Sequence, residues 1–176
     1  MFRKALFLAA LLIVPTIASA QAAHGPFELE LSASGSNGPN FNGFDADANG
    51  SLGFFFADTL EVSFRQSAAY SDIGGVAWAG SSRVAIDLHF PLGDQAQFLP
   101  FIGANGGYSY GAASVQDQWE VAPEAGLKLF VNGTTFLFAQ AEYQFNIDQH
   151  STGSNTLGNQ FQHGQFVYTA GVGFRF

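Results

Sequence analysis

The residues best able to support catalysis in this 176-residue sequence are its four histidines, His24, His89, His150 and His163. A hydrolytic site needs a hydroxyl nucleophile held against a histidine, with an acid that orients the ring. None of the histidines has a serine two positions later, the spacing that would put both side chains on one face of a strand. Ser151 directly follows His150, and neighbouring side chains of an extended chain point to opposite sides. We therefore expect no catalytic residues.

Metal, cofactor and nucleic-acid chemistry have equally little support. The sequence has no Cys, which excludes disulfides and thiolate metal sites. A weak calcium site could form from four acids near the long loops: Asp45, Asp47, Asp72 and Asp117. They do not have the fixed ligand spacing of a calcium loop, so we expect them to be solvated instead. The Gly-rich run 103–107 does not precede a helix and is not a nucleotide loop. The net charge of -8 excludes a nucleic-acid partner, because phosphate contacts need a basic surface. We expect no metal and no cofactor.

The first 20 residues have the form of a secretory signal peptide. A basic start is followed by an apolar run over residues 5–17 and by the small residues Ala-Ser-Ala at 18–20. The run is too short to span a bilayer as a helix, which takes about 20 apolar residues. Residues 1–20 are therefore predicted to be a signal peptide and residues 21–176 a single exported domain, with cleavage after Ala22 nearly as plausible as after Ala20.

After the signal peptide the sequence alternates between apolar and polar residues, with the period of two that is typical of strands. The final segment shows this best, since every second residue from Phe166 to Phe176 is apolar. Each alternating segment is about ten residues long, the length that a tilted strand needs to cross a bilayer. The eight predicted strands are 27–35, 44–56, 60–70, 78–90, 98–110, 119–130, 135–147 and 166–176.

The connections between these strands alternate in length. Three are short: 57–59, 91–97 and 131–134. The Asn132-Gly133 pair in the last of them indicates a hairpin, since both residues tolerate positive φ. The other connections are longer and polar, the longest running from 148 to 165. Short turns at one end and long loops at the other are typical of a transmembrane barrel. An even number of strands places both termini at the short-turn end, which would face the periplasm.

Two kinds of eight-stranded barrel fit this pattern, and the aromatic residues decide between them. A soluble barrel would point its apolar face inward, but an interior of this size is only just wide enough for side chains or one small ligand. The aromatic residues make up 15% of the sequence and would overfill it. They also concentrate near the two ends of the strands, with smaller apolar residues between, as the two aromatic girdles of a lipid-facing surface do. An eight-stranded antiparallel up-and-down transmembrane β-barrel is therefore predicted.

The opposite face of the strands carries the charges and is predicted to line the interior. Opposite charges there should pair, since an unpaired buried charge is costly. The predicted interior polar network is Glu28, Glu30, Glu61, Arg65, Arg83, Asp87, Glu120, Glu124, Lys128, Glu142 and Arg175. Five aromatic residues share this face near the short-turn end and are predicted to form a plug: Phe55, Phe101, Phe130, Phe136 and Phe138.

On these segments the chain resembles the small eight-stranded outer-membrane β-barrel family, which includes the OmpA transmembrane domain and OmpX. The segments that carry the resemblance are Ser51–Phe56, Pro100–Ala104, Pro123–Lys128 and Gly171–Phe176. The resemblance implies a place in the cell outer membrane among lipid and lipopolysaccharide. It also implies periplasmic chaperones and the barrel-assembly machinery as partners, with Phe174 and Phe176 as the assembly signal.

The family resemblance leaves the activity open, because such barrels serve structural, adhesive, channel and enzymatic roles. The first interpretation is a structural, envelope-integrity or surface-interaction role without catalysis. The polar loops 36–43 and 148–165 are either solvated connections, which their composition favours, or binding sites for an extracellular ligand. The alternatives are a narrow channel for small solutes and a lipid A-modifying enzyme.

Overall fold

The structure is a computed structural model of the whole chain, and it describes residues 25–37, 43–72, 77–93, 96–111, 117–147 and 165–176. The predicted signal peptide, His24, His150 and His163 lie outside the described residues. Most of the predicted 148–165 loop also lies outside them.

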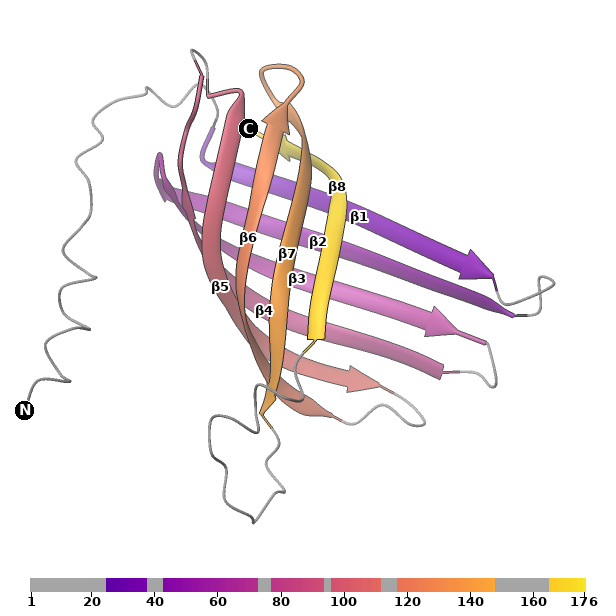
Figure 1. Cartoon of the computed structure of the whole chain (residues 1–176). Helices are drawn as coiled ribbons and strands as arrows, with labels where there is room; N and C mark the ends of the chain where they lie inside the picture. The colour runs from indigo at the N-terminus through magenta and orange to yellow at the C-terminus, as the bar shows by residue number, and fades with distance from the viewer. Residues whose placement is uncertain (1–24, 38–42, 73–76, 94–95, 112–116, 148–164) are drawn as a thin grey trace, which may run out of the picture.

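Eight antiparallel strands form a closed barrel in which each strand pairs with its neighbours in the sequence and β1 pairs with β8 (Figure 1). The all-β, eight-stranded fold predicted from the sequence is confirmed, and no predicted strand end is wrong by more than two residues. The strands are β1 Phe27–Asn37, β2 Phe44–Ala57, β3 Leu60–Ser71, β4 Ala77–His89, β5 Phe98–Gly111, β6 Gln118–Phe130, β7 Thr135–Ile147 and β8 Gln165–Arg175.

The alternation of polar and apolar residues in the sequence corresponds to the inner and outer faces of the barrel wall. On β3, Glu61 and Arg65 are buried in the barrel, while Leu60 and Phe64, each one position earlier, are exposed. In a protein surrounded by water this distribution would be unfavourable, because it exposes apolar area and buries charge. In a bilayer it is the favourable arrangement, since lipid surrounds the barrel.

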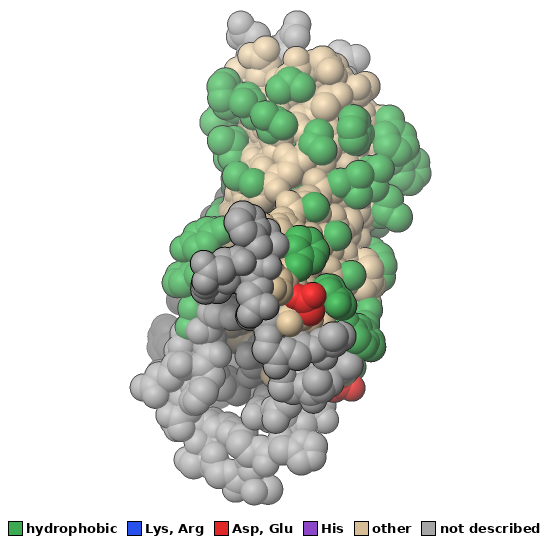
Figure 2. Space-filling view, turned by 90° about the vertical axis from the view of Figure 1, so that its right-hand side faces the viewer, with side chains coloured by type: hydrophobic (Ala, Val, Ile, Leu, Met, Phe, Trp, Pro, Cys, Tyr) green, Lys and Arg blue, Asp and Glu red, His purple; other side chains and the backbone are tan. Residues whose placement is uncertain are grey.

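The outer wall is apolar along its length. The face in Figure 2 shows hydrophobic side chains over the whole height of the barrel and acidic side chains only near one end. Aromatic residues mark both ends of the wall, with Phe56 and Phe176 at the short-turn end and Trp78 and Trp119 at the long-loop end. Among the described residues, no helix is long and apolar enough to cross a membrane.

The hairpin turn predicted at residues 131–134 is present. Neither Asn132 nor Gly133 has positive φ. The connection is a four-residue loop, and the side-chain Oδ1 of Asn132 accepts bonds from the N–H groups of Thr134 (2.9 Å) and Thr135 (2.8 Å). This Asx-type capping stabilises the turn in place of the left-handed conformation that a two-residue turn needs.

Strands β1 and β8 close the barrel over a short distance only. Their ladder runs from Glu28 opposite Arg175 to Leu31 opposite Val172, next to a pair of backbone hydrogen bonds between Phe27 and Phe176. Every other pair of neighbouring strands has a ladder of at least ten residue pairs. Beyond Leu31 and Val172 the two strands diverge toward the long-loop end (Figure 1).

Candidate functional site

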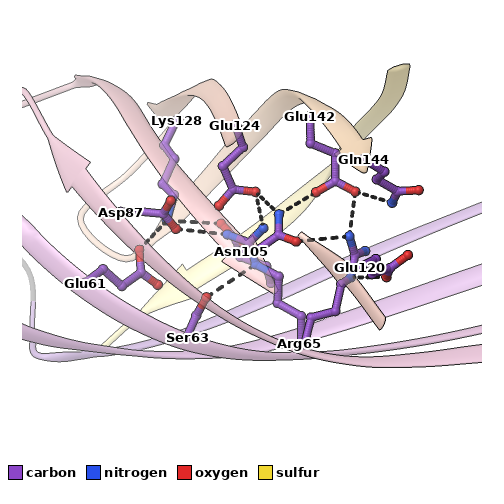
Figure 3. Close-up of polar contacts among 12 residues, drawn as sticks. Glu61, Ser63, Arg65, Asp87, Asn105, Glu120, Glu124, Lys128, Glu142 and Gln144 are labelled. Carbon is purple, nitrogen blue, oxygen red and sulfur yellow. Dashed lines mark hydrogen bonds and ion pairs between the residues drawn. The ribbon is translucent and has the colours of Figure 1, made fainter. Parts of the chain in front are cut away.

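The interior of the barrel is the candidate site, because all eight strands direct their polar side chains there. The structure places all eleven residues of the predicted polar network inside, ten of them buried and Arg83 nearly so. Ten of them form three clusters of charges, between an aromatic plug at the short-turn end and a cavity at the long-loop end. Figure 3 shows polar contacts within and between these clusters.

The plug fills the short-turn end of the lumen. Phe130, Phe136, Phe138 and Leu99 form one buried cluster, and Phe136 has no exposed surface at all. Phe55 and Phe101 are buried beside this cluster. The five phenylalanines predicted to point inward near this end therefore do so.

Glycines on neighbouring strands make room for these rings. Phe136 lies opposite Gly173 in the β7–β8 ladder, and a Cβ atom added to that glycine would lie 2.0 Å from the ring. Phe101 lies opposite Gly126 in the same way, with 2.4 Å to the ring. The same relation holds for Phe138 with Gly171, Asp87 with Gly103 and Arg83 with Gly107. Large inward side chains thus lie flat against backbone that has no side chain of its own, a packing role that the sequence reasoning missed.

The first charge cluster is centred on Lys128, which is buried directly above the plug. Its Nζ contacts the carboxylate of Glu28, Glu61 at 3.0 Å and Glu30 at 3.1 Å. The ammonium also lies 5.3 Å from the centroid of the Phe136 ring, within cation–π range. One cation therefore holds three carboxylates from β1 and β3, on the other side of the lumen from β6.

The second cluster is centred on Arg65 and spans the lumen. Its guanidinium contacts Asp87 at 2.9 Å and Glu124 at 2.6 Å, both of them buried. Asn105 donates from Nδ2 to Glu124 at 2.8 Å and to Glu142 at 2.7 Å, which joins this cluster to the next (Figure 3).

The third cluster borders the cavity. Arg83 contacts Glu142 at 2.6 Å and Glu120 at 3.6 Å. Gln144 donates to Glu142 at 2.6 Å. Contacts are continuous from Arg65 through Asn105 to Gln144, and each predicted cation except Arg175 is bound to more than one acid.

Arg175 differs from the predicted pattern. It donates from Nε to the carbonyl oxygen of Gly25 at 2.9 Å, and its guanidinium lies 3.4 Å from the centroid of the Phe55 ring. No ion pair joins it to a carboxylate within the described part of the chain. Arg175 therefore ties the end of β8 to the start of the chain and to the plug.

His89 is the one histidine within the described residues, and it lies inside the barrel. Its ring sits between Phe55 and Phe101, with centroids 5.1 and 5.3 Å away, and Nε2 is 3.4 Å from Glu61. It is buried and faces away from the lipid, so it cannot act on a lipid from the outer wall.

The acids considered for calcium serve local structure instead. Asp72 accepts a hydrogen bond from the backbone N–H of Phe44, and Asp117 accepts one from Gly111 at 3.3 Å. Among the described residues, no group of three or more His, Asp or Glu side chains is arranged to hold a metal ion.

One polar cluster on the outer wall has no counterpart in the sequence reasoning. Gln66 donates to the hydroxyl of Tyr110 and accepts a bond from Ser82, each at 2.7 Å. The three side chains lie on β3, β4 and β5 and satisfy one another, as lipid-facing polar groups must. All three residues occupy positions of the apolar face in the alternating pattern, and this could have identified them as lipid-facing from the sequence.

Solved structures share this architecture. The outer membrane protein OprG from Pseudomonas aeruginosa matches 87% of this chain and 96% of its own, with a TM-score of 0.56 and 15% identity. The N-terminal β-barrel domain of Pseudomonas aeruginosa OprF matches 87% and 99%, with a TM-score of 0.55 and 17% identity. The fold is that of the small outer-membrane β-barrels.

Neisserial surface protein A is a third such match, covering 85% of this chain and 97% of its own, with a TM-score of 0.58 and 15% identity. The sequence itself matches no protein-family model and no curated protein. The fold implied by the family resemblance is confirmed, and together with the apolar outer wall it is that of an integral outer-membrane protein.

Proposed function

We propose that this chain is a sealed outer-membrane barrel with a structural or surface-interaction role, and that it neither conducts steadily nor catalyses a reaction. The observation that carries the proposal is the filled lumen, in which the aromatic plug and three charge clusters follow one another. Between the plug and the outer cavity is a void of about 30 Å³, lined by Glu30, Ser51 and Arg65 among others. That volume is about the share of one water molecule in the liquid.

Residues 1–20 act in this proposal as a cleaved signal peptide, and 21–176 as the barrel domain. The short turns and both termini face the periplasm, and the long loops face outward. Phe174 and Phe176 serve as the assembly signal for the barrel-insertion machinery, after delivery by periplasmic chaperones. The surrounding partners are lipid and lipopolysaccharide, and an extracellular ligand would meet the long loops.

The buried charge clusters fit a structural role. An ion pair buried with both partners held by further hydrogen bonds fixes one arrangement, because breaking it leaves an uncompensated charge. Arg65 connects β3 to β4 and β6, and Lys128 connects β6 to β1 and β3. These contacts cross the lumen and hold opposite walls together, which favours a rigid seal.

A narrow cation channel is the second candidate, favoured by an excess of acid. The network has seven acids and four bases, and one carboxylate oxygen of each of Glu28, Asp87 and Glu124 is buried without a hydrogen-bond partner among the described residues. Such oxygens could hold a file of water and cations past the clusters.

Planar-bilayer recording of the purified barrel separates the two candidates. The sealed barrel should show no steady conductance, and the double variant Glu124→Gln/Glu142→Gln should stay silent as well. Replacing Phe136 and Phe101 with Ala, which removes two rings of the plug, should increase the frequency of brief openings. A steady cation-selective current in the parent that falls in the glutamine variant would overturn the sealed barrel in favour of the channel.

A further inference from the structure

A cavity of about 490 Å³ occupies the long-loop half of the barrel, beyond the charge clusters. Small-molecule sites in proteins have volumes of about 300–1,000 Å³. Much of the polar lining is hydroxyl, and Arg83 and Glu120 line its deeper end. The hydroxyl residues that line it are Ser32, Ser34, Ser67, Ser81, Ser109 and Thr169.

This cavity reaches the outer wall between β1 and β8. Its lining includes Ala33, Tyr168 and Ala170, which belong to the lipid-facing side of those two strands. The opening lies where the β1–β8 ladder has ended, beyond Leu31 and Val172. We call this opening the seam, bounded by residues 32–37 of β1 and 165–171 of β8.

The seam needs a hydrogen-bonding occupant. Alternate residues of an antiparallel strand direct both their N–H and C=O groups toward the same neighbour, so each unpaired edge presents backbone polar groups. Open sheet edges do not occur against hydrocarbon unless protein or a polar cavity satisfies them. Ser32, at the start of the seam, also has a buried hydroxyl with no hydrogen-bond partner among the described residues.

We propose that the seam and cavity bind a single-chain amphiphile with an uncharged, hydroxyl-rich head. The head enters the cavity through the seam and bonds the serine and threonine hydroxyls and the strand edges. The tail stays in the bilayer, against the apolar side chains that border the seam on the outer wall. Phe166 and Tyr168 are highly exposed on the β8 side, and Leu31 is exposed on the β1 side.

The charges of the cavity exclude an anionic head. Arg83, the one cation among the described residues of its lining, is already bound by Glu120 and Glu142 and does not offer a free charge to a phosphate. Asp47 adds a further carboxylate to the lining, next to Asn49, which donates to it at 2.7 Å. Neutral hydroxyls can donate to these carboxylates and accept from the strand edges, whereas a phosphate would be repelled.

The test compares dodecyl maltoside with dodecyl phosphate, which has the same tail and an anionic head. Native mass spectrometry of the full barrel in a fluorinated surfactant should show a retained maltoside and at least about ten-fold weaker retention of the phosphate. In the variant Ala33→Cys/Ala170→Cys, cross-linking should close the seam and abolish retention, and reduction should restore it. Cross-linked Leu31→Cys/Val172→Cys is the control, because those positions already pair.

A second variant keeps the test independent of cross-linking. Thr169→Leu removes a hydroxyl at the seam and should weaken maltoside retention, while Thr135→Leu, on the lipid side of β7 and outside the cavity, should not.

The proposal is overturned if the cross-linked seam still retains maltoside, or if both amphiphiles bind alike. It is also overturned if the parent forms a dimer that cross-linking abolishes, since a second copy would then cover the seam. The inference rests on the proposed sealed barrel, which planar-bilayer recording tests separately from amphiphile retention.

Discussion

Arg65 on β3 and Glu124 on β6 meet inside the barrel at 2.6 Å, although β4 and β5 lie between their strands in the wall and the two residues are 59 positions apart in sequence. Asp87 shares the same guanidinium at 2.9 Å. A contact of this kind depends on the barrel being closed, because only closure brings the inner faces of β3 and β6 together. The interaction therefore reports directly on the closure of the barrel.

Replacing Arg65 with Leu should lower the free energy of unfolding in detergent by about 3–5 kcal/mol, because Asp87 and Glu124 are left buried without their cation. Urea titration of the refolded barrel measures the change. Tyr168→Phe is the control, since that side chain is highly exposed and should leave the midpoint unchanged. Adding Glu124→Gln to Arg65→Leu should recover part of the loss, as expected for residues that interact directly. Equal midpoints for all variants would show that the pair does not stabilise the barrel.

The glycines beneath the plug give a second stability prediction. In Gly173→Ala the new methyl group would lie 2.0 Å from the Phe136 ring, which is completely buried. Overpacking of this kind costs about 1–3 kcal/mol, so the urea midpoint should fall. Gly133→Ala is the matched control, because a Cβ atom there has no neighbour within 4 Å and the residue does not have positive φ. A Gly173→Ala barrel as stable as the parent would mean that Phe136 moves freely.

The sequence predicted the strands and the two faces well, for a physical reason. Lipid outside and charge inside reverse the usual distribution, and period-two alternation then marks every strand along its length. The alternation does not determine which residues of neighbouring strands lie opposite each other. The contact between Phe136 and Gly173 could therefore not be predicted from the sequence. For the same reason the early end of the ladder at Leu31 and Val172 was not predicted.

The proposed orientation predicts which ends of the barrel react on intact cells. A cysteine replacing Asp117, at the long-loop end, should react with a membrane-impermeant thiol reagent. A cysteine replacing Thr134, in the short turn between β6 and β7, should react only after the outer membrane is permeabilised. Both positions are exposed in the folded barrel, so accessibility within the protein does not separate them. Labelling of Thr134→Cys alone on intact cells would invert the orientation.

The first and the last aromatic residues of the segment 165–176 allow assembly to be separated from lipid anchoring. Phe176 and Phe166 lie at opposite ends of the segment and are almost equally exposed, at 63% and 64%. If apolar contact with lipid were all that mattered, Phe176→Ser and Phe166→Ser would lower the amount of folded barrel in the outer membrane to the same degree. If Phe176 is part of the assembly signal, its replacement should reduce that amount several-fold more, while both variants refold alike from urea into detergent. Quantifying heat-modifiable barrel in isolated outer membranes, alongside the refolding yield, measures both effects, and equal losses in the membrane would remove the assembly role from Phe176.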